Sequence, residues 1–303
     1  MHIIKLDSNI KLPQSVIALG FFDGVHLGHR EVIDKAVSYA EILGIKSAVF
    51  TFKDRPKKNT ETKGLILKFE DKVNFIKELG IDNLIWADFD DKISHITSYN
   101  FIKDILVSKF NARLVVVGYN YHFGYKAEGS ADYLNKTGKK FGFKAEVIPA
   151  FKVSGKVVSS TIVKEFITSG RLDKAASFLG RYFFAEGRVI KGKGVGSRLG
   201  IHTANLNWPE GLIKPEDGVY AVLVRINDKL YKGVANLGHS PTIKEKPLTL
   251  EVHIFNFAKD IYKENIRVYF VEKIRDEKVF SGTEKLTEQI KEDIKKAKII
   301  LNA

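Results

Sequence analysis

Apolar residues in the first half of the chain alternate between short continuous runs and runs with helical spacing. The continuous runs, at residues 15–19, 47–52, 83–86, 114–117 and 143–148, have the length of buried strands. Between them, residues 32–43, 70–79, 99–110 and 131–140 carry apolar side chains at steps of three and four, as one face of a helix requires. Repeated strand–helix–strand units predict an α/β domain with a mostly parallel sheet, in which ligands bind beyond the carboxyl ends of the strands.

The pattern changes near residue 183. Two predicted helices, at 160–168 and 171–179, are followed by strand-like runs at 187–190, 202–207, 218–226, 230–236, 248–255 and 266–271, and then by helical spacing over 283–301. Asn227 and Asp228 separate two of these runs and predict a hairpin. We therefore expect an antiparallel β-barrel with a terminal helix, and a domain division into residues 1–184 and 185–303.

Composition narrows the classes of protein that this chain can represent. It has no cysteine, which excludes disulfides, thiolate nucleophiles and cysteine-bound metals, and it has no apolar run of membrane-spanning length. The first residues lack the features of a signal peptide, so we expect a cytoplasmic protein without a membrane partner. The net charge of +13 is compatible with nucleic acid, an anionic membrane surface or small polyphosphates as partners. The lysines are spread over all predicted elements without interleaved aromatics, which favours a solvated lysine-rich surface and argues against nucleic acid. The sequence carries no signal for an oligomeric state.

His26 and His29 stand three residues apart where the first predicted strand passes into a helix. Their spacing places both imidazoles on one face of the opening turn, beside the unpaired amides and the positive end of the helix dipole, which favours an anion. Gly24 and Gly28 would let a phosphate approach the backbone. A zinc-binding pair and two helix-capping histidines are the alternatives, although zinc pairs usually have four-residue spacing.

The decapeptide Gly-Phe-Phe-Asp-Gly-Val-His-Leu-Gly-His, at residues 20–29, resembles the nucleotidylyltransferase signature of bacterial bifunctional riboflavin kinase/FAD synthetases. Further motifs follow in the family's order: Val-Gly-Tyr-Asn-Tyr-His-Phe-Gly at 117–124, Ser-Ser-Thr-Ile-Val-Lys at 159–164 and Leu-Gly-Ile-His-Thr-Ala-Asn at 199–205. The resemblance covers nearly the whole chain. It implies a Rossmann-like nucleotidylyltransferase domain followed by a riboflavin kinase-like barrel.

In the first domain, the resemblance implies that His26 and His29 are catalytic and bind the α-phosphate of ATP. It implies phosphate or ATP binding by Gly20, Phe22, Asp23, Gly24, Gly28, Ser160, Thr161 and Lys164, and flavin or nucleotide binding by Asn120 and Phe123. Two motifs depart from the family pattern. Lys164 replaces an arginine, which keeps the charge but not the bidentate grip on phosphate, and Asp54-Arg55 replaces a Pro-His pair.

In the second domain, the glycine-rich run 192–200 is a weak phosphate-loop signal by itself. The resemblance implies that Thr203 and Asn205 bind Mg²⁺ and ATP phosphates through hard oxygen ligands, and that Glu251 is the general base for the riboflavin 5′-hydroxyl. Ile201-His202 stands where the family has Phe-Pro, so the rigid backbone before Thr203 is absent.

These features predict an FAD synthetase that transfers AMP from ATP to FMN, with Mg²⁺ as cofactor. The resemblance implies a riboflavin kinase-like second domain, and the Ile201-His202 departure leaves open whether it phosphorylates riboflavin. Two alternatives stay open at this point. One is a monofunctional FMN adenylyltransferase whose barrel is inactive as a kinase, and the other is a non-catalytic regulator that binds flavin or RNA.

Overall fold

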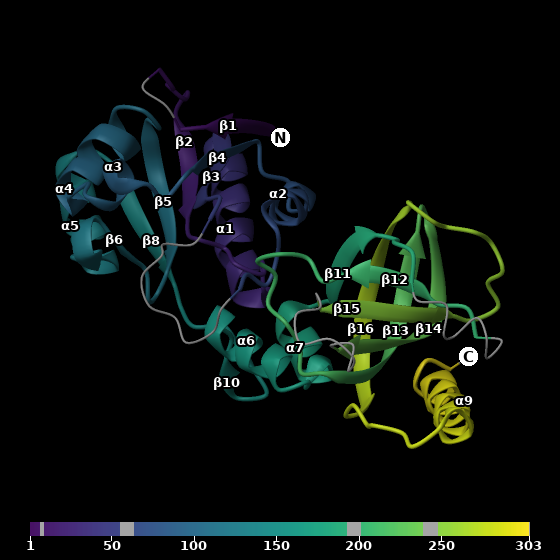
Figure 1. The fold of residues 1–303 in the computed structure, drawn as a ribbon. Coiled ribbons are helices and arrows are strands. Elements are labelled where there is room, and N and C mark those ends of the chain that lie inside the picture. The colour runs from purple at the N-terminus through teal and green to yellow at the C-terminus, as the bar shows by residue number, and fades with distance from the viewer. Residues whose placement is uncertain (7–8, 55–63, 193–200, 239–247, 303) are drawn as a thin grey trace. The chain divides into compact units, whose positions relative to one another are not determined.

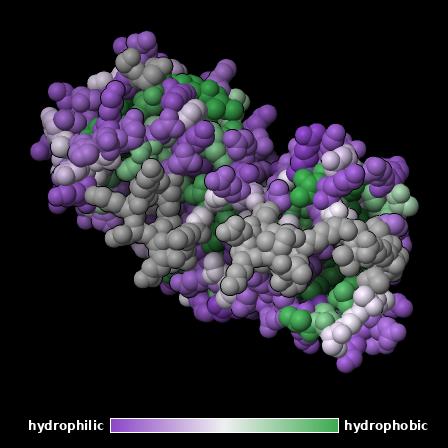
Figure 2. Space-filling model, viewed as in Figure 1, coloured by the Kyte–Doolittle hydropathy of each residue, from purple (hydrophilic) through white to green (hydrophobic). Residues whose placement is uncertain are grey.

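The computed structural model describes residues 1–6, 9–54, 64–192, 201–238 and 248–302. Contacts divide the chain into two compact units. The first contains residues 1–61 and 67–160, and the second contains residues 62–66 and 161–303. No helix in the described ranges is long and apolar enough to cross a bilayer. Figure 2 shows that hydrophilic side chains predominate on the face in view, as expected for a chain with scattered lysines.

The first unit is built on a parallel sheet of six described strands in the order β1-β4-β3-β2-β5-β8 (Figure 1). The strands are β1 (His2–Lys5), β2 (Ser15–Leu19), β3 (Lys46–Phe52), β4 (Asn83–Ala87), β5 (Ala112–Gly118) and β8 (Lys144–Ile148). All five residues of β2 are buried, which explains its continuous apolar sequence. The predicted parallel sheet is confirmed.

Strand β1 is the element of this sheet that the apolar pattern did not predict. It has four residues, it pairs with β4 at the sheet edge, and its Ile3 is 55% exposed. An edge strand so short and so solvent-accessible has neither a continuous apolar run nor a buried face to reveal it. The histidine loop therefore follows the second strand of the chain rather than the first.

Helices connect the parallel strands. α1 (Leu27–Leu43) lies against β2, β3 and β5, and α5 (Ala131–Lys140) lies against β8. α2 (Phe69–Glu78) precedes β4, and the short α3 (Asp91–Ser94) follows it. The helix expected over 99–110 begins as α4 (Ser98–Asn100) and continues as a π-helix over Phe101–Val107. That wider turn is accompanied by the bond from the Ser108 amide to the Lys103 carbonyl, five residues back.

The first unit also contains two small two-stranded antiparallel sheets. β6 (His122–Phe123) pairs with β7 (Gly129–Ser130), and β9 (Lys152–Val153) pairs with β10 (Lys156–Val157). The β6–β7 pair follows β5 at the carboxyl edge of the sheet, so it holds Phe123 close to the end of β5.

The second unit is an antiparallel barrel preceded by two helices, α6 (Ser160–Thr168) and α7 (Leu172–Leu179). Its strands are β11 (Phe183–Arg188), β12 (Ala204–Asn207), β13 (Gly218–Ile226), β14 (Lys229–Gly238), β15 (Thr249–Ile254) and β16 (Asn265–Arg275), in the order β11-β16-β13-β14-β15-β12. A bridge between Ile190 and Asn205 joins the two end strands, so the barrel is nearly closed. The predicted barrel is confirmed.

The predicted hairpin joins β13 to β14, where Ile226 pairs with Lys229 and Asn227 adopts a φ of 52°. The terminal helix predicted over residues 283–301 is observed as α9 (Thr283–Ile300), which packs on β13 and β14 (Figure 1). In the barrel, the buried ring of Phe270 contacts the buried rings of Phe183 and Tyr220.

The contacts place α7 with the barrel, where it lies against β16. The predicted domain division at residues 184 and 185 would assign this helix to the first domain. That division concerns which segment folds independently, and it stays a prediction.

We expect Ile17→Ala to destabilise the first unit by about 2 to 5 kcal/mol, because it empties part of a close-packed core. Ile17 lies in the central strand β2 and is fully buried. Ile3→Ala is the matched control on the exposed edge strand β1, with an expected change within about 0.5 kcal/mol. Urea unfolding of both variants measures the difference, and equal losses would contradict the assigned core.

Candidate active sites

The loop after β2 reaches α1 through three residues with left-handed backbone. Phe22, Gly24 and Val25 have φ values of 53°, 85° and 38°, of which only the glycine adopts such a value without strain. The buried ring of Phe22 folds back over Gly20, where a Cβ would lie 2.8 Å from the ring. Glycine at position 20 is therefore required by this close approach.

His26 is the N-cap of α1. The backbone amide of His29 donates to His26 Nδ1 at 3.2 Å, and an accepting Nδ1 places the proton of the neutral ring on Nε2. The imidazoles of His26 and His29 stack with centroids 3.5 Å apart, and the ring of Phe22 meets His29 edge-on. Capping by Nδ1 and donation by the Nε2–H are thus compatible in His26, because they use different ring nitrogens.

Ser160, at the start of α6, lies beside the same loop. Its hydroxyl donates to the Asp23 carbonyl at 3.0 Å, and Asp23 is buried. Thr161 is exposed. Lys164 is 1% exposed in the second unit, and its ammonium donates to the Gly64 carbonyl at 2.7 Å. The Ser-Ser-Thr motif therefore has Ser160 at the histidine loop, while Lys164 binds a backbone carbonyl.

A cavity of about 1010 Å³ opens at the carboxyl ends of β2 and β5. Gly20, Phe22 and His29 line it from the loop after β2, and Asn120 and Phe123 line it from the segment after β5. Aromatic side chains missed by the sequence reasoning, including Phe52, Phe89, Tyr121 and Tyr125, form much of the wall. Burial raises the pKa of Tyr121, which keeps its hydroxyl neutral. The cavity has the apolar, aromatic lining that a large planar ligand needs.

Lys72 is a second residue that the sequence reasoning missed. It shares the buried face of α2 with Val73 and Ile76, and it is 3% exposed. Burial lowers the pKa of Lys72 to about 8, although the carboxylates of Asp23 and Asp54 act in the opposite direction. A lysine within an otherwise apolar helical stripe was the signal that could have identified it.

In the barrel, strand register brings three polar residues into one row. Asn205 of β12 pairs with Glu251 of β15, which pairs with Asn236 of β14, so their side chains share one face of the sheet. Just before β12, Thr203 accepts from the Asn205 amide, whose Nδ2 lies 3.3 Å from the Thr203 carbonyl and 3.5 Å from its hydroxyl. The predicted Thr203, Asn205 and Glu251 are therefore neighbours.

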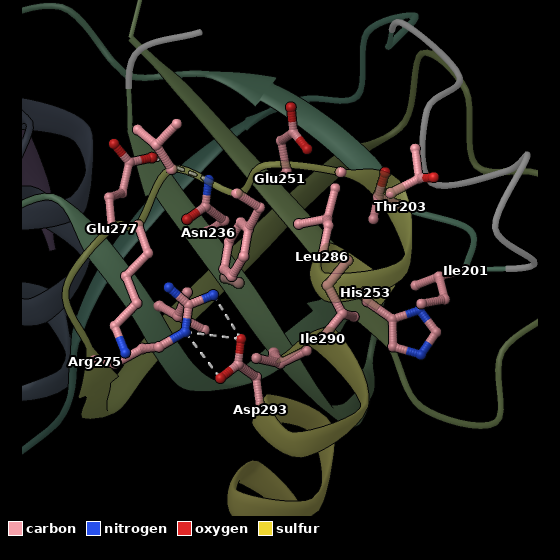
Figure 3. A pocket seen from close by; sticks show the side chains of 18 of the residues that line it. Ile201, Thr203, Asn236, Glu251, His253, Arg275, Glu277, Leu286, Ile290 and Asp293 are labelled. Carbon is pink, nitrogen blue, oxygen red and sulfur yellow. Dashed lines mark hydrogen bonds and ion pairs between the residues drawn. The ribbon is translucent and has the colours of Figure 1, made fainter. Parts of the chain in front are cut away.

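Thr203, Asn236 and Glu251 face a cavity of about 690 Å³, which residues of α9, including Leu286 and Ile290, close on another side (Figure 3). Arg275 holds this helix. Its Nε and Nη2 donate to the buried carboxylate of Asp293 at 2.9 Å and 2.7 Å, as the dashed lines in Figure 3 mark. A bidentate ion pair thus ties one wall of the cavity to β16.

Ile201-His202, which replaces Phe-Pro, lies in the described part of the chain. The His202 carbonyl contacts Nδ1 of His253 at 2.9 Å, and His253 and Ile201 both line the cavity. A carbonyl can only accept, so Nδ1 of His253 carries the proton. This bond ties the backbone before Thr203 to β15, where a proline would have restricted it directly.

No group of three or more His, Asp or Glu side chains in the described ranges could hold a metal ion. Within these ranges, His26 and His29 are therefore not joined by a third His, Asp or Glu ligand, as a zinc site would require. Residues 193–200 of the glycine-rich run, together with Arg55, lie outside the described residues.

Comparisons with known proteins match both halves. The family model described as FAD synthetase matches residues 8–162, and the one described as riboflavin kinase matches residues 179–301. A protein from Bacillus subtilis named bifunctional riboflavin kinase/FMN adenylyltransferase is 33% identical, and the match covers 98% of this chain and 94% of that protein. A protein of the same name from Escherichia coli K12 is 32% identical, and the match covers 97% of this chain and 96% of that protein. A crystal structure from Streptococcus pneumoniae, titled a macrolide-efflux protein, has a TM-score of 0.89 at 29% identity, with 98% of this chain and 99% of that chain covered.

We expect His26→Ala to destabilise the first unit by about 1 kcal/mol, because it removes the acceptor that caps α1. His26→Asn should keep nearly full stability, since asparagine is a strong N-cap. Urea unfolding of the two variants checks this. If Asn is as destabilising as Ala, the ring of His26 stabilises the loop through something other than the cap.

Proposed function

Because this chain belongs to the family of bifunctional riboflavin kinases/FMN adenylyltransferases, we propose that it makes FAD from riboflavin in two steps. The barrel would transfer the γ-phosphoryl group of ATP to riboflavin, which gives FMN and ADP. The first unit would transfer AMP from a second ATP to FMN, which gives FAD and pyrophosphate. The observation that carries the proposal is that each unit has a cavity lined by residues of its own motifs, His29 and Asn120 in the first unit and Thr203 and Glu251 in the barrel.

For adenylyl transfer, a phosphate oxygen of FMN attacks the α-phosphorus of ATP, and the bond to the β-phosphate oxygen breaks. The aromatic wall of the larger cavity, with Asn120 and Phe123, would hold the flavin. His29 and the Nε2–H of His26 would donate to the α-phosphoryl oxygens beside the start of α1, where charge accumulates in the transition state. No covalent intermediate on the protein is needed.

The remaining phosphate contacts are proposed from the motif. Gly24 and Gly28 would let the phosphates approach the backbone, and Ser160 and Thr161 would bind the leaving pyrophosphate. Lys164, whose ammonium donates one hydrogen bond to the Gly64 carbonyl, would place a positive charge near that anion. Mg²⁺ bound with the nucleotide would offset the negative charge of the phosphates.

For riboflavin phosphorylation, the carboxylate of Glu251 would take the proton of the riboflavin 5′-hydroxyl as that oxygen attacks the γ-phosphorus. Thr203 and Asn205 offer neutral oxygen atoms, which suit a Mg²⁺ ion bound chiefly by ATP phosphates. The bond from His253 to the His202 carbonyl supports an active kinase, because it steadies the segment that lacks the proline.

The direct test incubates the purified protein with ATP and Mg²⁺ and supplies FMN or riboflavin separately. Chromatography of the flavins should show FAD from FMN, and FMN followed by FAD from riboflavin. Absence of FAD from FMN would overturn the adenylyltransferase. FAD from FMN without FMN from riboflavin would leave a monofunctional enzyme with an inactive barrel.

Two variants should separate the reactions. His26→Asn should lower the kcat of FAD formation by roughly 10²- to 10³-fold, because it removes the proposed donor to the transition state while keeping the cap. Glu251→Gln should lower FMN formation from riboflavin by roughly 10²- to 10⁴-fold, because it removes the base. Each variant is the control for the other, and loss of both reactions in either one would contradict separate sites.

A further inference from the structure

The buried Lys72 connects three parts of the first unit at the carboxyl edge of its sheet. From α2, its ammonium donates to the Phe52 carbonyl at the end of β3, at 2.6 Å, and to the Phe21 carbonyl in the loop after β2, at 3.1 Å. The hydroxyl of Thr51 lies 3.4 Å away. The ammonium also lies 4.4 Å from the centre of the Phe21 ring. These contacts use the hydrogen-bonding capacity of a protonated amine, which has three donors.

The Phe21 carbonyl accepts from two buried side chains. Thr51 donates its hydroxyl to this oxygen at 2.9 Å, in addition to the bond from Lys72. The next residue is Phe22, whose left-handed backbone begins the turn that carries His26 into α1. A strained backbone persists only where its surroundings hold it, and these two donors act on the peptide group directly before the strain.

The charge on Lys72 is suited to this task. Burial disfavours the charged form, but the negative charges of Asp23 in the same loop and of Asp54 beyond β3 favour it. A methionine would fill the same space without the cost of burying a charge, so core packing alone does not account for a lysine here.

We propose that Lys72 is a positioning residue of the adenylyl-transfer site, which acts by holding the Phe21 carbonyl and so the loop that presents His26 and His29. Thr51 holds the same carbonyl. The kinetic part of this inference rests on the proposed function, whereas the structural part concerns the loop itself.

The experiment compares Lys72→Met, Thr51→Val and the double variant in the full chain. Lys46→Met is the matched control. Lys46 is an exposed lysine that pairs with Asp82 at the amino end of β3, which is the edge of the sheet opposite to Lys72. Phosphorylation of riboflavin by the barrel reports that the rest of the chain is intact. Amide hydrogen exchange of the peptide spanning residues 20–30 reports the loop without requiring catalysis.

Lys72→Met should lower the kcat of FAD formation by roughly 10²-fold, with a much smaller change in the KM for FMN, because a displacement of about 1 Å at the reacting group has that effect. Exchange in the 20–30 peptide should become roughly tenfold faster. Thr51→Val should change both quantities in the same direction by less, and the double variant should be non-additive because both side chains bind one carbonyl. Lys46→Met should match the wild type.

Unchanged exchange and kcat in Lys72→Met would overturn the proposal, as would strictly additive effects in the double variant. If Lys72→Met does not fold, Thr51→Val decides by the same two readouts. If the wild type makes no FAD, the proposed function fails, while the exchange comparison still decides whether Lys72 holds the loop.

Discussion

The first site depends on the adjacency of β2 and β5. The chain leaves β2 toward β3 on one side, and it leaves β5 toward β8 on the other side. The connections that follow the carboxyl ends of β2 and β5 therefore diverge, and a space remains between these two connections. That space is the larger cavity, and its wall takes residues from both connections. The loop after β2 can reach α1 only by a tight turn, which uses left-handed backbone at Phe22 and Val25 as well as at Gly24. The two non-glycine residues must therefore be held by their surroundings, and this requirement explains why buried polar side chains gather behind the loop.

In the barrel, strand register performs the equivalent task, because Asn205, Glu251 and Asn236 all lie within regular strands. Pairing of β12, β15 and β14 aligns Asn205, Glu251 and Asn236 on one face, so a shift of one residue in any strand would send a site residue to the opposite face. Both the barrel closure at Asn205 and the hairpin after β13 help to define that register. The cavity is completed by α9, which a bidentate ion pair fixes to β16.

The sequence predicted what periodicity and contiguous motifs encode. Buried strands such as β2, the amphipathic helix α1, most of the barrel strands and the decapeptide of residues 20–29 have local signals. β11 is the exception among the barrel strands, because it begins at Phe183 whereas the strand was expected at 187–190. What it missed depends on tertiary neighbours. β1 is a strand because β4 provides its partners, and the π-helix after α4 follows from local hydrogen bonding that apolar spacing does not distinguish. Lys72 binds the Phe21 carbonyl, which is 51 residues away, and Lys164 binds the Gly64 carbonyl, which is 100 residues away, so no contiguous motif could reveal these two bonds.

The buried charges of the two units have a common physical logic. Replacing a buried ionic group by an apolar one of similar size is often neutral or stabilising, so such groups are weak contributors to stability. Lys72 and Asp293 nevertheless occupy positions where each holds a wall of a cavity, the first through the Phe21 carbonyl and the second through Arg275. A hydrogen bond restricts direction as well as distance, whereas apolar packing restricts chiefly volume. The proposed roles of these walls, which are to present donors to a phosphate and a base to a hydroxyl, require that directional restriction. The location of these charges is therefore better explained by the geometry of the sites than by the stability of the fold.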